Sequence, residues 1–210
     1  MERQTAENIL GAKTLRDLEA LKRSGVLNNF YLGGGTGAAL HLRHRRSFDL
    51  DFFTAKPFNE TLLVKKLSGK GVFTLEAKEP GTVVGAFNDT RVSFFHYPYP
   101  LLKRPVATFG VNVAHLADLA CMKLDAIASR GSKKDFIDFY FILQRRYRLV
   151  AVFRLFKKKY KGVAYNSIHI QKGLVFFAAA DAEKMPRMLA PLSWETVKAF
   201  FRREIKELSR

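Results

Sequence analysis

The spacing of hydrophobic residues along this chain changes near residue 112. Before that point, short apolar runs separated by glycine, proline and asparagine predict strands over residues 30–32, 48–53, 72–77, 82–87 and 91–95, with an edge strand over 106–111. Helices are predicted there over residues 5–23, 36–42 and 57–67. After residue 112, helical spacing predicts helices over residues 113–130, 132–143, 150–160, 167–179 and 193–208. The pattern therefore predicts an α+β fold, with a mixed domain over residues 1–112 and an all-helical domain over residues 113–210.

Two carboxylates interrupt the apolar run at residues 48–53. Asp49 and Asp51 are two positions apart, and residues two apart in a strand point to the same face. Neighbouring carboxylates repel unless a positive group lies between them, and hard cations such as Mg²⁺ prefer oxygen ligands. We therefore expect Asp49 and Asp51 to bind Mg²⁺ or Mn²⁺.

Glycines precede this strand by the length of one predicted helix. The run Gly33-Gly34-Gly35-Thr36 matches neither a Walker loop nor a dinucleotide-binding fingerprint, so alone it indicates either a tight turn or a phosphate contact. Together with the aspartate pair it favours a nucleoside triphosphate site, in which glycines hold phosphates and a metal ion neutralises them. The basic turn at residues 44–47 is then a solvated turn, a charge balance for the aspartates, or a clamp on phosphate oxygens.

The net charge of +17 is unevenly distributed along the chain. Residues 1–102 carry 14 basic and 10 acidic side chains, whereas residues 103–210 carry 22 and 9. A C-terminal half this basic indicates a polyanionic partner, most simply nucleic acid, although solubility alone would also account for the charge.

Composition indicates the class and compartment of the protein. Hydrophobic residues make up 48% of the chain, which is enough for a folded core, and the longest apolar run, residues 174–180, is too short to cross a membrane. The N-terminal residues lack the pattern of a signal peptide, and a single cysteine, Cys121, fits a reducing compartment. We expect a cytoplasmic protein that has no membrane partner.

Residues 33–53, GGGTGAALHLRHRRSFDLDFF, resemble the G-G-T…H-R-x-S-x-D-x-D-F-F signature of AbiEii/AbiGii-type nucleotidyltransferase toxins, within the polymerase-β-like superfamily. Residues 123–138 resemble the K-x-x-A…R…K/R-D-x-x-D segment of that family, and residues 173–186 resemble its late Y-F-x-D-A-E…P segment. Residues 194–201 resemble its closing helix. The resemblance therefore extends from about residue 30 to the end of the chain.

The resemblance implies a polymerase-β-like mixed sheet and metal-dependent transfer of a nucleoside monophosphate from a triphosphate to an acceptor hydroxyl. RNA, such as a tRNA end, is the expected acceptor, and an antitoxin protein is an expected partner. The residues expected to bind metal or take part in catalysis are Asp49, Asp51, Lys123 and Asp135, and those expected to bind nucleotide are Gly34, Gly35, Thr36, Arg45, Ser47, Lys123 and Arg130. Asp138 and Asp181 match further acidic positions.

Several of these residues also have purely structural interpretations. Lys123 lies beside the apolar stripe of its helix and is equally consistent with a solvated lysine, whereas Arg130, two turns along the same face, suits an anion shared with Lys123. Asp135 follows Ser132 at the spacing of a helix cap, and Asp138 is placed to pair with Lys134.

One departure from the superfamily pattern concerns a third carboxylate. Relatives often carry one on a later strand, but residues 91–96 contain none, so Asp89 or Glu76 would substitute only if the fold brings them in. This absence leaves an alternative function, a nucleic-acid-binding module with a degenerate transferase site. A third hypothesis is a basic structural protein, but this function would leave the aspartate pair unexplained.

Overall fold

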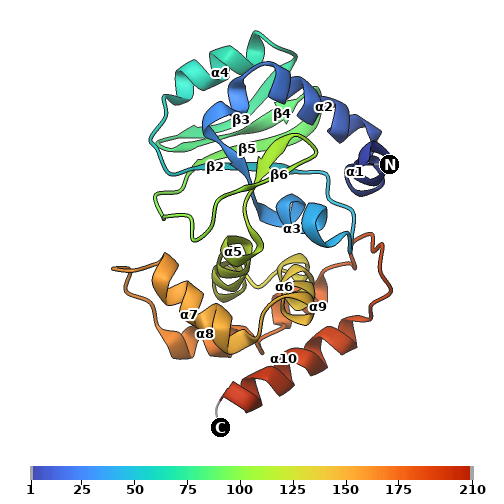
Figure 1. Ribbon diagram of the computed structural model, residues 1–210, viewed down its shortest axis with the longest axis vertical. Coiled ribbons are helices and arrows are strands. Elements are labelled where there is room, and N and C mark those ends of the chain that lie inside the picture. The colour runs from blue at the N-terminus through green and yellow to red at the C-terminus, as the bar shows by residue number, and fades with distance from the viewer. Residues whose placement is uncertain (1, 209–210) are drawn as a thin grey trace.

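A mixed sheet forms the centre of the N-terminal half in the computed structural model, which describes residues 2–208 (Figure 1). The strands of this seven-stranded sheet are β1 (Tyr31–Leu32), β2 (Leu50–Thr54), β3 (Phe73–Glu79), β4 (Thr82–Phe87), β5 (Thr90–His96), β6 (Val106–Thr108) and β7 (Val111–Val113). Their spatial order is β3-β4-β5-β2-β1-β7-β6. Strand β2 runs parallel to β5 and antiparallel to β1, so the sheet is mixed, as predicted.

The helices of the N-terminal half are α1 (Glu2–Leu10), α2 (Ala12–Arg23), α3 (Gly34–Leu42) and α4 (Glu60–Ser68), with a 3₁₀ turn at Val26–Asn29. The prediction of a single helix over residues 5–23 is wrong, because Gly11, with a φ of 80°, separates α1 from α2. Helix α4 starts later than predicted, at the residue after Asn59, whose side chain accepts a hydrogen bond from the Leu62 amide.

The predicted edge strand over residues 106–111 is instead a hairpin of β6 and β7. Phe109 and Gly110 both have positive φ, at 50° and 76°, which is the geometry of a tight two-residue turn. Strand β7 pairs in parallel with β1, so it lies inside the sheet, and β6 forms the edge.

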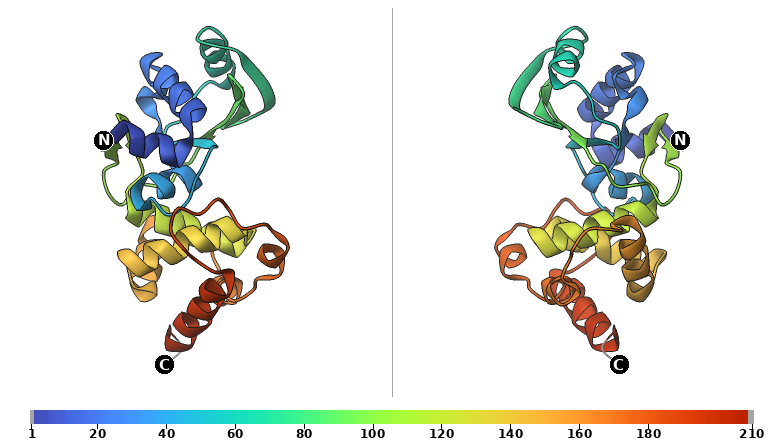
Figure 2. Two further views of the ribbon diagram at one scale, coloured as in Figure 1. Left: turned by 90° about the vertical axis from the view of Figure 1, so that its right-hand side faces the viewer. Right: turned by 90° about the vertical axis from the view of Figure 1, so that its left-hand side faces the viewer.

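The C-terminal half consists of α5 (Leu116–Ser129), α6 (Lys133–Arg145), α7 (Leu149–Lys159), α8 (Ser167–Gly173), α9 (Ala178–Ala182) and α10 (Trp194–Leu208). The helix predicted over residues 167–179 is two helices, because the chain leaves helical geometry after Gly173 and Phe177 packs against Phe136 and Trp194. Helices α5 and α6 lie next to the sheet half, and α10 lies at the far end of the molecule (Figures 1 and 2). Within residues 2–208, no helix has both the length and the apolar content needed to span a membrane.

Two buried hydrophobic clusters lie on either side of β2. Leu50 and Phe52 belong to the cluster formed with α1, α2 and α4, whereas Phe53 packs against the cluster formed by the C-terminal helices. Burial along β2 alternates with a period of two, so Asp51 and Phe53 face the helical half. The two clusters resemble the proposed division near residue 112, which stays a prediction about folding units.

Candidate active site

A cavity of about 380 Å³ lies between the sheet and the helical half. Its walls come from the start of α3, from β2 and β5, and from α5 and α6; they include Gly34, Gly35, Asp51, Phe53, His96, Tyr97, Lys123, Asp125, Arg130 and Asp135. The cavity therefore brings the predicted glycines, one predicted metal ligand and three predicted residues of the helical half to one place.

Gly34 packs directly against Asp51 at the start of α3. It has a φ of +57°, and a Cβ placed on it would lie 2.5 Å from Asp51 Oδ2. The amide of the preceding Gly33 donates to the backbone oxygen of Asp51 at 2.8 Å. Only glycine satisfies both the backbone angle and this close approach, so Gly34 holds the first turn of α3 against the carboxylate.

The two predicted metal ligands differ in their surroundings. Asp51 is half-buried on β2, whereas Asp49 is exposed and lies one residue before the strand, which begins at Leu50 and not at residue 48. Burial and the negative charge of Asp49 raise the pKa of Asp51, and Lys123 and a hydrogen bond from Ser93 act in the opposite direction. The charge of Asp49 therefore adds to the negative potential at Asp51, although only Asp51 of the two lines the cavity.

The segment before Asp49 is held by buried hydroxyl groups. Thr36 Oγ1 lies 2.8 Å from Ser47 Oγ and also hydrogen-bonds to the backbone oxygen of Asp49. Thr36 and Ser47 are both buried, and neither lines the cavity. In this structure the two predicted nucleotide contacts therefore position the Asp49 backbone.

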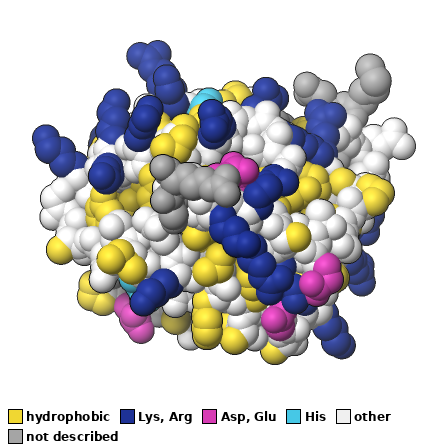
Figure 3. Space-filling model, turned by 90° about the horizontal axis from the view of Figure 1, so that it is seen from below, with side chains coloured by type: hydrophobic (Ala, Val, Ile, Leu, Met, Phe, Trp, Pro, Cys, Tyr) yellow, Lys and Arg dark blue, Asp and Glu magenta, His cyan; other side chains and the backbone are white. Residues whose placement is uncertain are grey.

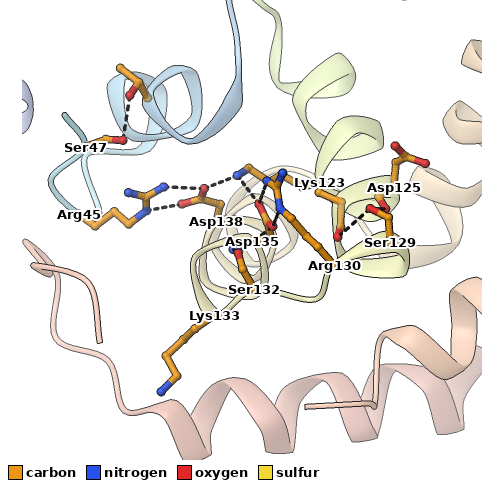
Figure 4. A network of polar contacts seen from close by, with 12 residues as sticks. Arg45, Ser47, Lys123, Asp125, Ser129, Arg130, Ser132, Lys133, Asp135 and Asp138 are labelled. Carbon is orange, nitrogen blue, oxygen red and sulfur yellow. Dashed lines mark hydrogen bonds and ion pairs between the residues drawn. The ribbon is translucent and has the colours of Figure 1, made fainter. Parts of the chain in front are cut away.

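A buried ion-pair network joins this segment to α5 and α6 (Figure 4). Asp138 Oδ1 accepts hydrogen bonds from Arg45 Nε at 2.6 Å and His44 Nε2 at 2.8 Å, and its Oδ2 accepts from Arg45 Nη2 at 2.8 Å. Lys123 Nζ lies 2.7 Å from Asp138 Oδ2 and 2.8 Å from Asp135 Oδ1. Charged groups from three segments of the chain thus satisfy one another beside the cavity.

The network corrects three interpretations of single residues. Lys123 is only 4% exposed, so it is not a solvated lysine. Asp138 is fully buried and pairs with Arg45 and Lys123 instead of Lys134. Arg45 is buried as well, and both edges of its guanidinium group are engaged, so it balances Asp138 and is not an open clamp for phosphate.

Asp135 takes part in the N-terminal cap of α6, which Ser132 forms, and its carboxylate pairs with Lys123 and Arg130. Its backbone amide donates a hydrogen bond to Ser132 Oγ, the predicted cap. Its carboxylate accepts hydrogen bonds from Arg130 Nε at 2.8 Å and from Arg130 Nη2 at 3.1 Å. The anion predicted to be shared by Lys123 and Arg130 is therefore Asp135 itself. The Arg130 side chain remains 67% exposed, so it also meets the solvent of the cavity.

The charged state of the network follows from its contacts. Burial acts to raise the pKa of Asp138, but Arg45 and Lys123 outweigh it and hold the pKa well below the ordinary range. Burial also acts to raise the pKa of Asp135, but Lys123 and Arg130 outweigh it and lower this pKa to about 2. Burial acts to lower the pKa of Lys123, yet the two carboxylates raise it. The pairs are thus ionised at neutral pH.

Residues 83–209 match the family described as "Nucleotidyl transferase AbiEii toxin, Type IV TA system". The chain belongs to the AbiEii nucleotidyltransferase toxin family. It is 37% identical over 195 residues to the uncharacterized protein aq_aa25 of Aquifex aeolicus, and the alignment covers 90% of this chain and 93% of the relative. Membership confirms the resemblance seen in the sequence, and it makes the protein a nucleotidyltransferase.

Solved structures confirm the fold of this AbiEii-family protein. MenT4, a nucleotidyltransferase toxin of Mycobacterium tuberculosis H37Rv, aligns with a TM-score of 0.59 at 16% identity, over 100% of this chain and 89% of that one. JHP933 of Helicobacter pylori aligns with a TM-score of 0.52 at 15% identity, over 95% of each chain.

The AbiEii-family chain has no third carboxylate on the strand beside Asp51. Ser93 of β5 is the residue in register with Asp51. Asp89 pairs with Lys13 at the surface, and Glu76 contacts Arg91, so neither of the suggested substitutes lines the cavity. Within residues 2–208 no group of three or more histidine, cysteine or acidic side chains is arranged to hold a metal ion. Any metal in this cavity would therefore depend on Asp51, on Asp49, which does not itself line the cavity, and on oxygens that substrate and water supply.

Other residues of the cavity wall are not predicted from the sequence. Asp125 lies on α5 at the cavity wall, and partial burial there raises the pKa of its carboxyl against the opposing effect of Arg130. His96 and Tyr97 enter from the end of β5. An aspartate on the polar side of a helix carries no sequence signal of its own, and Tyr97 lies in a Tyr-Pro-Tyr-Pro segment, whose prolines indicate only that strand and helix are interrupted there.

Asp181 lies outside the cavity. Its Oδ1 accepts hydrogen bonds from Trp194 Nε1 at 2.6 Å and Lys198 Nζ at 3.1 Å, and these bonds link α9 to α10. The structure therefore separates Asp181 from the other predicted site residues.

Proposed function

We propose that this protein uses a divalent metal ion to transfer a nucleoside monophosphate from a nucleoside triphosphate to a hydroxyl group of RNA, as a toxin paired with an antitoxin protein. The observation that carries the proposal is the contact of Gly34 with Asp51 at the cavity wall. Backbone amides at the start of a helix bind phosphate favourably, and those of α3 lie next to Asp51, which supports a triphosphate site beside the carboxylate that would hold the metal.

Asp49 and Asp51 fit a magnesium site. Mg²⁺ is usually bound by one or two carboxylates together with waters and substrate phosphates, so two aspartates are sufficient. Their mutual repulsion, which contributes to the raised pKa of Asp51, would be relieved by a cation. Mg²⁺ held there would supply charge neutralisation for the phosphates of the bound nucleotide.

The remaining residues have distinct proposed roles. Gly34 and Gly35 offer backbone amides to the phosphates, and the exposed Arg130 offers a guanidinium group from the opposite wall. Lys123 and Asp135 keep that wall in place. In the reaction, the acceptor oxygen forms a bond to the α-phosphorus while the bond from that phosphorus to pyrophosphate breaks, and the hydroxyl proton passes to water.

RNA is proposed as the acceptor because of the charge of the helical half. Residues 103–210 carry 22 basic and 9 acidic side chains. Lysine and arginine side chains are spread over the end of the molecule that the helical half forms, with few acidic groups among them (Figure 3). A surface of this kind attracts a phosphate backbone without reading its sequence.

The test is transfer of label from each nucleoside triphosphate to total RNA in the presence of Mg²⁺. The wild type and Asp89→Asn, which changes an exposed aspartate outside the cavity, are expected to label RNA, while Asp51→Asn is expected to lose at least about a hundredfold in rate, on the scale of a lost electrostatic contact to the transition state. Absence of label with every nucleotide, together with RNA binding, would instead establish a nucleic-acid-binding module with a degenerate site. Ser93 beside Asp51 favours that second function.

A further inference from the structure

A second hollow, of about 600 Å³, opens beside the candidate active site. It lies between the end of α5, α8 and the segment that follows α8, and it shares Ser129 and Arg130 with the first cavity. Most of its lining is apolar, including Val175 and Phe176, but Lys172 also lines it. The two hollows thus adjoin along one turn of α5, with Arg130 common to both.

Phe176 is the unexplained residue of this hollow. Its neighbour Phe177 is buried and packs against Phe136 in a tilted contact and against Trp194 edge to face, so core packing accounts for it. Phe176 lies outside that cluster and is 68% exposed, and the adjacent Val175 is exposed as well. Exposed apolar side chains gathered at a hollow, next to basic groups, indicate a ligand that has both a flat apolar part and negative charge.

We propose that this hollow binds an unpaired nucleotide of the RNA acceptor, with its base against Phe176 and its phosphates near Arg130 and Lys172. The inference rests on the proposed transferase function and specifies where the acceptor end lies. Aromatic side chains stack on any base, and guanidinium and ammonium groups pair with phosphate. Because Arg130 lines both hollows, a strand whose base occupies the second one passes Arg130 to reach the first, which Asp51 also lines.

The occupant is a nucleotide and not a peptide because of the charge of the surroundings. Residues 103–210 carry a large basic excess, and Lys172 and Arg130 flank the apolar surface. A peptide would use the apolar surface equally well without requiring a phosphate at these two side chains. Dependence on both Phe176 and Lys172 therefore distinguishes a nucleotide from a protein segment.

The test compares two fluorescent RNA hairpins, one with a single-stranded 3′ tail and one with a blunt end. Phe176→Ala is expected to weaken binding of the tailed hairpin by about ten- to a hundredfold and to leave binding of the blunt hairpin and of Mg²⁺–nucleotide unchanged. Phe176→Trp is expected to restore tail binding. Lys172→Ala is expected to weaken binding and to reduce the salt dependence by about one phosphate contact.

Matched controls come from the sheet half. Val72→Ala removes a 72% exposed apolar side chain before β3, and Lys66→Ala removes an exposed charge on α4, so both are expected to bind the tailed hairpin as the wild type does. Thermal melting of each variant checks that it is folded.

Two outcomes separate the inference from the proposed function. If the wild type labels RNA but Phe176→Ala labels and binds it equally well, or if the wild type does not prefer the tail, the nucleotide subsite is overturned and the transferase function stands. If no RNA is labelled but the tail preference still depends on Phe176, the acceptor chemistry is overturned and a nucleotide-binding hollow remains. Loss of binding in Phe176→Ala but not in Lys172→Ala would assign the hollow to an apolar partner and overturn the inference.

Discussion

Replacing Asp138 by asparagine tests whether the buried charges hold the two halves of the protein together. Asp138 is fully buried, accepts hydrogen bonds from Arg45 and His44, and forms an ion pair with Lys123. Asparagine keeps the volume but removes the charge, so Arg45 and Lys123 lose a buried counter-ion. Removing one partner of a buried ion pair costs about 3–5 kcal/mol. Because asparagine still offers one oxygen, we expect about 3 kcal/mol, a large part of the roughly 5–15 kcal/mol available to a folded domain.

The assay is thermal and urea unfolding of the wild type, Asp138→Asn and Asp89→Asn. Asp89 makes its ion pair with Lys13 at the surface, so the same chemical change there is expected to cost less than about 1 kcal/mol. For a chain of this length, about 3 kcal/mol corresponds to a drop of roughly 6–12 °C in the melting temperature. Equal destabilisation by the two variants would show that the buried network does not stabilise the fold, and the reasoning would be wrong.

Three further predictions concern single side chains. Gly34→Ala is expected to reduce the rate of nucleotide transfer at least about tenfold. Gly162 also has a positive φ but nothing within 4 Å of a Cβ, so Gly162→Ala should show only a backbone cost of about 1–2 kcal/mol in thermal melting. Equal transfer activity of the two variants would refute the steric argument. The lowered pKa of Asp135, about 2, means that its contribution to stability is complete above pH of about 4 and is lost as the pH falls toward 2, so the urea midpoint should fall in that window and Asp135→Asn should flatten the fall. Lys159→Met leaves the buried carboxylate of Asp118 without its cation and should cost about 3–5 kcal/mol in unfolding experiments, and a cost below about 1 kcal/mol would contradict it.

Local signals in the sequence predicted the elements whose formation is local. Ser132 begins α6 as expected, because a cap needs only its own helix, and the alternation along β2 placed Asp51 on the polar side of a half-buried strand. The sequence failed where distant segments decide the outcome. Strand β7 is internal because it pairs with β1, and α8 and α9 separate because Phe177 packs on α6 and α10.

The site shows the same division. Residue types and spacing identified the glycines, Asp49 and Asp51, but burial decides what Arg45 and Lys123 do, and burial comes from the packing of α3 against α5 and α6. A buried guanidinium and a solvated one look identical in a sequence. The pairing of Arg45 with Asp138 could not be predicted from spacing, because the two residues are 93 positions apart.

The length of that separation has a consequence for synthesis on the ribosome. Both aspartates of the proposed metal site emerge early, but the carboxylate that neutralises Arg45 belongs to α6 and emerges 93 residues after it. Until then the guanidinium group has no buried counter-ion, and because burying an unpaired charge is unfavourable, we expect the segment leading into β2 to stay hydrated. We therefore expect nascent and prematurely terminated chains that contain the aspartates to lack the assembled site. For a toxin, this order of synthesis would delay activity until most of the chain has been made.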